Sequence, residues 1–206
     1  MLRKRREIFQ RWLEELPSRE LVVLDIGGRL QPYRPLLTGR IRRYIAVDLR
    51  RTPLVDVIAR GEQLPFPGDT FDLVICTQVL QYVPEPELLA QEIRRVLKPG
   101  GSLLLSVPSA WPSDSAEDCW RFLPAGLRHL LGAFDQVQIE AEGGTVAGFF
   151  RLLNVWLSMV ARYPFLRTIF GYSIFPLVNV AGSALQGLTS SRNEQFAVNY
   201  SVCARK

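Results

Sequence analysis

The sequence predicts an α/β fold built on a mostly parallel, doubly wound sheet. Short apolar runs, suited to burial on both faces, alternate with segments that have helical spacing. Two consecutive runs, 21–26 and 42–47, end at or beside an acid, Asp25 and Asp48 respectively. Ligands of such sheets bind beyond the carboxyl ends of the strands, so we expect a nucleotide or nucleoside site at this edge.

The bulk composition suits one globular domain spanning residues 1–206. The chain is 48% hydrophobic, which is enough for a full core, and its net charge is +5, with much of the positive charge in 3–6. Cys76, Cys119 and Cys203 lack metal-ligand spacing and are interpreted as thiols of a reducing compartment. We therefore expect no metal site and a cytoplasmic protein. Basic residues are not interleaved with aromatic ones, which argues against a nucleic-acid substrate.

The N-terminal segment 1–18 is predicted to contain an amphipathic helix over 3–16, ended by Pro17. Its apolar residues recur at helical spacing and its other face is charged. Two interpretations stay open: the helix docks on the sheet, or it contacts an anionic membrane.

The later elements follow from apolar runs and from proline and glycine breaks. Strands are predicted at 21–26, 42–47, 54–58, 71–76, 102–107, 135–140 and 194–205, and helices at 86–97 and 124–131, with a short helix or turn at 31–38.

The acids and glycines between the first two strands suggest specific contacts. A carboxylate at the end of the second strand, Asp48, can accept hydrogen bonds from both hydroxyls of a ribose. Gly27 and Gly28 would let a ligand approach the backbone, and Asp25 would orient this loop or bind a ligand ammonium. The loop lacks the G-x-G-x-x-G pattern, so a dinucleotide is a poor candidate.

Four stretches, VLDIGG, YIAVDL, EQLPFPGDTFDLVICT and RVLKPGGSLLLSV, occur in an order that resembles class I S-adenosylmethionine-dependent methyltransferases of the small-molecule type. The resemblance covers about residues 20–142 and the final strand. It implies a Rossmann-like, seven-stranded sheet with an antiparallel last strand, and S-adenosylmethionine as cofactor. The stretches GGRLQPYRPLL and DCWRFLPAGLRHLL resemble, more loosely, a bacterial subgroup associated with envelope polysaccharide and glycolipid pathways.

The resemblance also implies which residues contact the cofactor. The implied set is Asp25, Gly27, Gly28, Asp48, Leu49, Glu62, Gln63, Leu64, Thr77, Gln78 and Val79. Three positions depart from the family pattern: Leu30 replaces a common third glycine, Arg60 a common acid of the adenine loop, and Gln81-Tyr82 a frequent glutamate-histidine pair.

The catalytic group is not identified by the sequence, and a base is needed only if the acceptor must lose a proton. Candidate bases are Asp114, Asp118, His129 and Tyr82, for which loop charges and a structural or solvated histidine are the alternatives. Candidate acceptor contacts are Tyr33, Trp111, Trp120 and Arg121, for which core or lid packing is the alternative.

Before the last strand, an apolar segment of about fifty residues, 144–191, replaces the family's short connection. We expect a helical insertion, and three interpretations stay open. It is a cap over the acceptor that also dips into a membrane, a soluble lid, or a homodimer surface.

These observations lead to one functional hypothesis and two alternatives. The chain is expected to be a methyltransferase at the inner face of the membrane, contacting it through 1–16 and 144–191. Its expected reaction is O-methylation of a saccharide, a glycolipid or another small or lipid-linked acceptor. The alternatives are a non-catalytic binding or scaffold module with the same fold, and a methyltransferase for a quinone-like lipid.

Overall fold

A computed structural model of the chain describes residues 2–16, 20–160, 175–188 and 197–206. The chain divides into two compact units. The sheet unit comprises 1–140 and 199–206, and the insertion unit comprises 141–198. Each is described by itself below.

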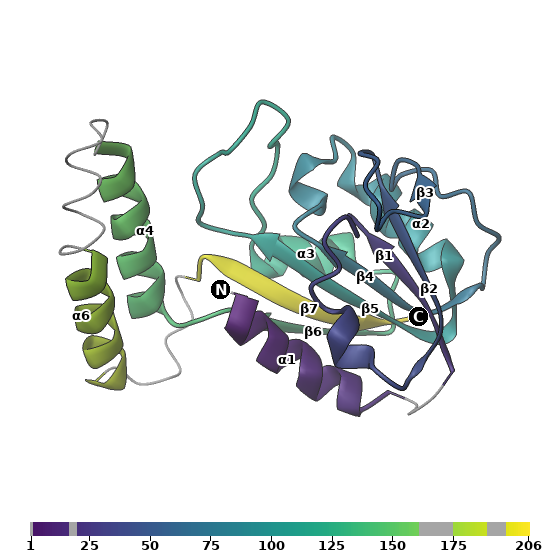
Figure 1. The fold of residues 1–206 in the computed structure, drawn as a ribbon, viewed down its shortest axis with the longest axis horizontal. Helices are drawn as coiled ribbons and strands as arrows, with labels where there is room; N and C mark the ends of the chain where they lie inside the picture. The colour runs from purple at the N-terminus through teal and green to yellow at the C-terminus, as the bar shows by residue number, and fades with distance from the viewer. Residues whose placement is uncertain (1, 17–19, 161–174, 189–196) are drawn as a thin grey trace. The chain divides into compact units, whose positions relative to one another are not determined.

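The sheet unit contains a seven-stranded sheet in the order β3-β2-β1-β4-β5-β7-β6 (Figure 1). The strands are β1 (Leu21–Ile26), β2 (Ile41–Asp48), β3 (Val57–Ile58), β4 (Phe71–Thr77), β5 (Leu97–Pro108), β6 (Gln136–Ala141) and β7 (Asn199–Arg205). β1 pairs in parallel with β2 and β4, β2 with β3, and β4 with β5, whereas β7 is antiparallel to β5. The predicted α/β sheet with an antiparallel last strand is confirmed.

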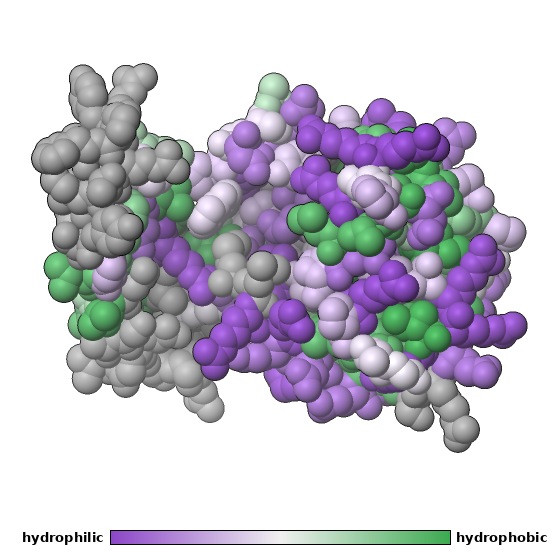
Figure 2. Space-filling view, in the orientation of Figure 1, coloured by the Kyte–Doolittle hydropathy of each residue, from purple (hydrophilic) through white to green (hydrophobic). Residues whose placement is uncertain are grey.

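Helix α1 (Leu2–Glu14) covers one face of the sheet. Its apolar residues Ile8, Phe9, Trp12 and Leu13 are buried against side chains of β1, β4 and β5. The exposed side of α1 carries charged residues and is hydrophilic in Figure 2. The predicted helix is confirmed, and because its apolar face belongs to the core, only its charged side remains for contact with a membrane.

Four shorter elements complete the sheet unit. They are the 3-10 helices η1 (Arg34–Leu37) and η2 (Leu80–Tyr82) and the α-helices α2 (Pro86–Val96) and α3 (Pro124–Leu130). α2 buries Leu89, Ile93 and Val96, whose spacing places them on one side of the helix. Between β1 and β2 the chain forms only the 3-10 helix η1, where the prolines of 31–38 predicted a short helix or turn.

β3 is shorter than the predicted strand 54–58. The backbone N–H of Val55 donates to the carbonyl of Thr52, so residues 52–55 form a turn. Asp56 then closes the turn against β2, because its carboxylate accepts the N–H of Ala46 and its own N–H donates to the carbonyl of Ala46. Only Val57 and Ile58 remain to pair with β2.

β5 begins at Leu97, five residues before the predicted start at Ser102. The backbone N–H of Gly100 donates to the carbonyl of Lys206 at 2.6 Å, and the N–H of Lys206 donates to the carbonyl of Gly101 at 3.0 Å. The pairing of Leu97 with Phe71 of β4 and these bonds to Lys206 together extend the strand.

The insertion unit contains the helices α4 (Thr145–Val160) and α6 (Phe175–Leu188), which lie side by side (Figure 1). They account for the described part of the predicted insertion, and its residues 161–174 and 189–191 lie outside the described ranges. Within the described residues, no helix has both the length and the apolarity needed to cross a membrane.

Candidate functional site

The carboxyl end of β1 places Asp25 in a buried position, 3% exposed. The phenol of Tyr44, on β2, donates a 2.5 Å hydrogen bond to Asp25 Oδ2. Burial raises the pKa of Asp25 to about 7; the Tyr44 hydrogen bond opposes this rise, and the charge of Asp48 adds to it. Asp25 is therefore an acid whose charge changes near neutral pH.

Asp48 ends β2 and is half-buried. Its Oδ1 accepts the backbone N–H of Arg50 at 2.8 Å, which fixes the carboxylate at the start of the following loop. Its Oδ2 has no hydrogen bond among the described residues. That oxygen can accept a hydrogen bond from a ligand hydroxyl.

The glycine pair after β1 is required by packing. Gly27 has a φ of +78°, and a Cβ atom there would lie 2.3 Å from Cγ2 of Val79. A Cβ on Gly28 would lie 2.9 Å from the Cβ of Ala46. Both glycine N–H groups donate to the carbonyl of Val47. The glycines thus join the ends of β1, β2 and β4 closely, and they direct these two N–H groups to β2.

Gln31 connects the loop after β1 to the loop after β2. Its side-chain Nε2 donates to the carbonyl of Leu54 at 2.6 Å, and its Oε1 accepts from Arg34 at 2.9 Å. The Arg34 guanidinium lies 5.1 Å from the ring centroid of Tyr44. Gln31 has a φ of +46°, a strained value for a residue other than glycine. The two loops and the Tyr44–Asp25 pair therefore form one connected network.

Exposed aliphatic side chains lie on the same segments as this network. Leu30 follows β1, Leu49 and Leu54 follow β2, and Ile58 ends β3. An apolar surface beside the carboxylate of Asp48 suits a planar, uncharged ring such as adenine.

The loop that was predicted to border adenine is held by α2. Glu92 accepts the N–H of Leu64 at 2.9 Å, and Arg95 donates to the carbonyl of Leu64 at 3.1 Å. Leu64 is buried, Gln63 is exposed, and the Glu62 carboxylate forms a 2.8 Å ion pair with Arg60. Gln63 therefore has the most accessible side chain of the three predicted residues.

β4 ends at the half-buried Thr77, and the segment after it begins with Gln78, which has a φ of +56°. The N–H of Gln78 donates to the carbonyl of Ser106, and its side chain donates to the Ser106 hydroxyl at 3.3 Å. These bonds to β5 fix a backbone conformation that costs energy in a residue with a Cβ atom. Such strain is concentrated at functional sites.

The 3-10 helix η2 is joined to the loop after β5 through three neighbouring residues. The Tyr82 phenol donates to the carboxylate of Asp114, 2.8 and 3.0 Å from its two oxygens. The carbonyl of Gln81 accepts the N–H groups of Cys119 and Trp120, and the indole of Trp120 donates to the carbonyl of Val83. Burial and the adjacent Asp114 raise the pKa of Tyr82. The phenol therefore stays protonated and acts as a donor.

Gln81 itself is 3% exposed, and its Oε1 has no hydrogen-bond partner among the described residues. A buried carbonyl oxygen without a donor is costly, so this atom is a candidate contact for a ligand donor.

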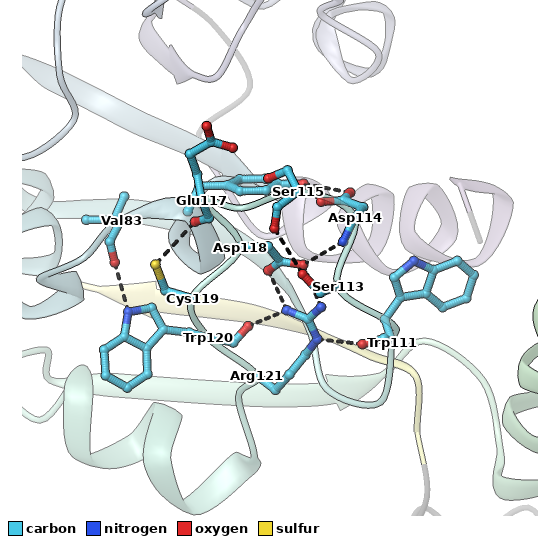
Figure 3. A network of polar contacts seen from close by, with 11 residues as sticks. Val83, Trp111, Ser113, Asp114, Ser115, Glu117, Asp118, Cys119, Trp120 and Arg121 are labelled. Carbon is cyan, nitrogen blue, oxygen red and sulfur yellow. Dashed lines mark hydrogen bonds and ion pairs between the residues drawn. The ribbon is translucent and has the colours of Figure 1, made fainter.

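Arg121 braces the loop after β5 (Figure 3). Its guanidinium binds both carboxylate oxygens of Asp118 and also donates to the carbonyls of Trp111 and Trp120. The hydrogen bonds from Arg121 lower the pKa of Asp118, whose carboxylate also accepts the N–H of Asp114. Asp118 and Arg121 therefore shape the loop, and Asp114 is the carboxylate held by Tyr82.

The structure thus brings together three of the four residues predicted to contact the acceptor, Trp111, Trp120 and Arg121. It leaves the fourth, Tyr33, and the candidate base His129 outside this group. Tyr33 is buried in the core, where its ring packs on Phe9 and its hydroxyl accepts a hydrogen bond from Arg5. His129 is exposed on α3, and no described contact joins it to the loop network. Among the described residues, no cluster of histidine, cysteine and acidic side chains could hold a metal ion.

Tyr44, Gln31, Arg34 and Gln81 were not predicted as members of the site. The sequence contained one usable signal for Tyr44. Side chains of neighbouring parallel strands that point to the same face lie close together, and Asp25 pairs in register with Ala46, two residues beyond Tyr44. A long side chain at position 44 can therefore reach Asp25.

Comparison with known proteins places residues 24–105 in a family model described as a methyltransferase domain. Over 103 residues the chain is 38% identical to the ubiquinone biosynthesis O-methyltransferase of Xanthomonas oryzae, covering 47% of this chain and 41% of that protein. The chain spans less than half the length of the first curated relatives that it matches.

Two solved structures show the same fold. A SAM-dependent methyltransferase from Archaeoglobus fulgidus aligns with a TM-score of 0.61 at 16% identity, covering 98% of this chain and 94% of that one. The [4+2]-cyclase SpnF aligns with a TM-score of 0.62 at 20% identity, covering 97% and 81%. Because one of them is named for a cyclisation, the fold alone does not specify the reaction.

Proposed function

Since this chain belongs to the class I S-adenosylmethionine-dependent methyltransferases, with S-adenosylmethionine as its cofactor, we propose that it transfers a methyl group to a small or lipid-linked acceptor. One observation carries the proposal. Two carboxylates, Asp25 and Asp48, end adjacent parallel strands beside exposed aliphatic side chains. This combination suits a ligand that has an ammonium, a ribose and a nucleobase.

The residues present fit this cofactor. Asp48 has a carboxylate oxygen for ribose hydroxyls, and the side chains of Leu30, Leu49, Leu54 and Ile58 offer an apolar surface for adenine. Asp25 supplies a negative charge for the ammonium once it loses its proton. When bound, S-adenosylmethionine supplies a methyl group on a good leaving group, so alignment of the acceptor provides much of the rate acceleration.

For an acceptor hydroxyl, Asp114 is the proposed base. Its carboxylate is held by the Tyr82 phenol, on a loop that Arg121 braces. Asp114 would take the proton of the acceptor hydroxyl, and S-adenosylmethionine, when bound, would supply the methyl group and leave as S-adenosylhomocysteine. Trp111 and Trp120, on the same loop, offer aromatic faces for a sugar ring.

The proposed acceptor is a saccharide carried on a lipid, and the proposed location is the cytoplasmic face of a membrane. The exposed apolar residues of the insertion unit support a lipid-linked acceptor. A quinone-like lipid is the second candidate, and similarity to a ubiquinone biosynthesis O-methyltransferase favours it. The proposed arrangement is one catalytic domain, 1–206, with 144–191 as its apolar insertion, and a homodimer is an alternative use of that insertion.

Calorimetry with S-adenosylmethionine and S-adenosylhomocysteine tests the cofactor site. We expect saturable binding that weakens at least about tenfold in Asp48→Asn, because the ribose hydroxyls lose a charged acceptor. Asp135→Asn changes an exposed acid that directly precedes β6; it is the matched control and is expected to bind normally. Absence of binding by the unmodified protein would favour the non-catalytic scaffold.

The acceptor is tested with methyl-labelled cofactor and bacterial lipid extract. Mild acid hydrolysis of the labelled product separates the two candidates. Label in the water-soluble saccharide fraction supports the lipid-linked saccharide, and label retained in an acid-stable lipid supports the quinone-like acceptor.

A further inference from the structure

The helices of the insertion unit expose large apolar side chains. On α4 these are Phe149, Trp156 and Met159, and on α6 they are Leu177 and Val180. Trp156 is 58% exposed and Leu177 is 68% exposed. Intervals of seven and three residues place the α4 side chains on one side of that helix, and an interval of three does the same on α6. Each helix therefore has an exposed apolar side.

The two helices are packed together on a different side. Gly182 is buried on α6, and a Cβ atom there would lie 2.9 Å from the ring of Phe150 on α4. The close approach of Phe150 leaves its neighbour Phe149 exposed. The exposed apolar side is therefore additional to the surface that joins α4 to α6.

The charged residues of the segment 144–192 are all basic. Between Gly143 and Arg192 the sequence has no aspartate or glutamate, and its charged residues are Arg151, Arg162, Arg167 and Arg192. Protein–protein interfaces have polar rims in which charges of both signs occur. A segment that combines exposed apolar side chains, a tryptophan and basic charge without any acid is complementary to lipid with negatively charged headgroups.

We propose that the exposed apolar side of α4 and α6 inserts into the boundary between headgroups and acyl chains of a membrane that contains anionic phospholipid. Phe149, Trp156, Met159, Leu177 and Val180 enter the acyl region, and the basic charge of the segment favours anionic headgroups. This inference extends the proposed function, because a membrane contact would bring the site to a lipid-linked acceptor, and its biological role rests on that proposal. Vesicle binding itself needs neither cofactor nor acceptor.

The test is sedimentation of the full chain with vesicles of phosphatidylcholine alone or with added phosphatidylglycerol. We expect binding to the mixed vesicles that is at least about tenfold tighter than binding to phosphatidylcholine and that weakens with salt. Leu177→Glu and Trp156→Glu are each expected to weaken it about tenfold or more, because each places a charge in the acyl region.

Leu88→Glu is the matched control. It makes the same change on α2 of the sheet unit, where Leu88 is exposed, and it is expected to leave vesicle binding unaltered. Brominated lipid should quench part of the tryptophan fluorescence of the unmodified chain, and the Trp156→Phe variant should lose that part.

Two results would overturn the proposal. One is vesicle binding that is absent, or equal in Leu177→Glu, Trp156→Glu and Leu88→Glu. The other is a homodimer that Trp156→Glu converts to monomer without any binding to vesicles, which assigns the surface to a second copy of the chain. Calorimetry with S-adenosylmethionine in the absence of vesicles reports separately on the proposed function.

Discussion

The phenol of Tyr44 donates a 2.5 Å hydrogen bond to the buried carboxylate of Asp25 across two neighbouring parallel strands. This contact gives Asp25 a single described hydrogen-bond donor where solvent would offer several, and burial raises its pKa to about 7. The pair therefore connects the protonation of the site to the stability of the domain and to binding of the cofactor.

The first prediction concerns stability without ligand. Because the folded-state pKa of Asp25 is raised from 3.8 to about 7, the folded protein binds more protons than the unfolded chain between these values. The contribution of Asp25 to the free energy of unfolding therefore falls as pH rises from about 4 to 7, at up to about 1.4 kcal/mol per pH unit. Urea denaturation at several pH values should show that this fall is smaller in Asp25→Asn. Parallel curves for the two proteins would contradict the assignment.

The second prediction concerns the cofactor. The carboxylate form of Asp25 attracts an ammonium, so binding of S-adenosylmethionine at pH 7 should release a fraction of a proton to solvent. Calorimetry in buffers of different ionisation enthalpy measures that release directly. Tyr44→Phe removes a bond that lowers the pKa of Asp25, so affinity at pH 7 should fall about threefold to tenfold and recover at pH 9. An equal loss at both pH values would mean that Tyr44 acts only through packing.

The third prediction separates the candidate bases. Asp114→Asn should lower kcat about 10²-fold to 10⁴-fold, as expected for loss of a general base, while the Kd for S-adenosylmethionine stays unchanged. Tyr82→Phe should lower kcat less, about tenfold, because the carboxylate remains and loses only its donor. Glu117→Gln, an exposed acid of the same loop, is the matched control. If Glu117→Gln and Asp114→Asn were equally active, the proposed proton transfer would be wrong.

The fourth prediction concerns the glycine loop. Gly27→Ala should lower the free energy of unfolding by about 1–3 kcal/mol or more, because a positive φ and a 2.3 Å contact with Val79 act together. Gly39→Ala isolates the backbone part of this cost, since Gly39 has a φ of +77° and its Cβ would meet nothing within 4 Å. Adding Val79→Ala to Gly27→Ala should recover the part of the lost free energy of unfolding that comes from the contact with Val79. No recovery would show that the backbone conformation alone accounts for the loss.

The sequence was sufficient to predict the sheet because the information is local. Runs such as Leu21–Ile26 and Phe71–Thr77 are apolar on both faces, and their predicted bounds match the strands to within one residue. The helix that contains Ile8, Phe9 and Trp12 also followed from spacing alone. The family resemblance supplied the antiparallel last strand, which apolar periodicity does not encode.

Contacts between distant segments could not be predicted in this way. The Tyr44–Asp25 hydrogen bond depends on the register of β1 against β2, and the early start of β5 depends on its pairing with Phe71 of β4 and with Lys206. Tyr33 is an aromatic residue of the type that often lines ligand pockets, but it is buried beneath α1. The Tyr82–Asp114 contact joins residues 32 positions apart, so each could be proposed only separately.

The position of β7 has a consequence for the order of folding during synthesis. This strand lies between β5 and β6, and β7 is the only neighbour of β6 among the described strands. Everything from Ala141 to Val198 leaves the ribosome before β7, so β6 and the edge of β5 wait for their partner while the apolar helices are already made. Sheet closure therefore waits for β7, and a nascent chain arrested before residue 199 should expose to chaperones the unpaired edge of the seven β5 residues that β7 would pair with, Ser102–Pro108.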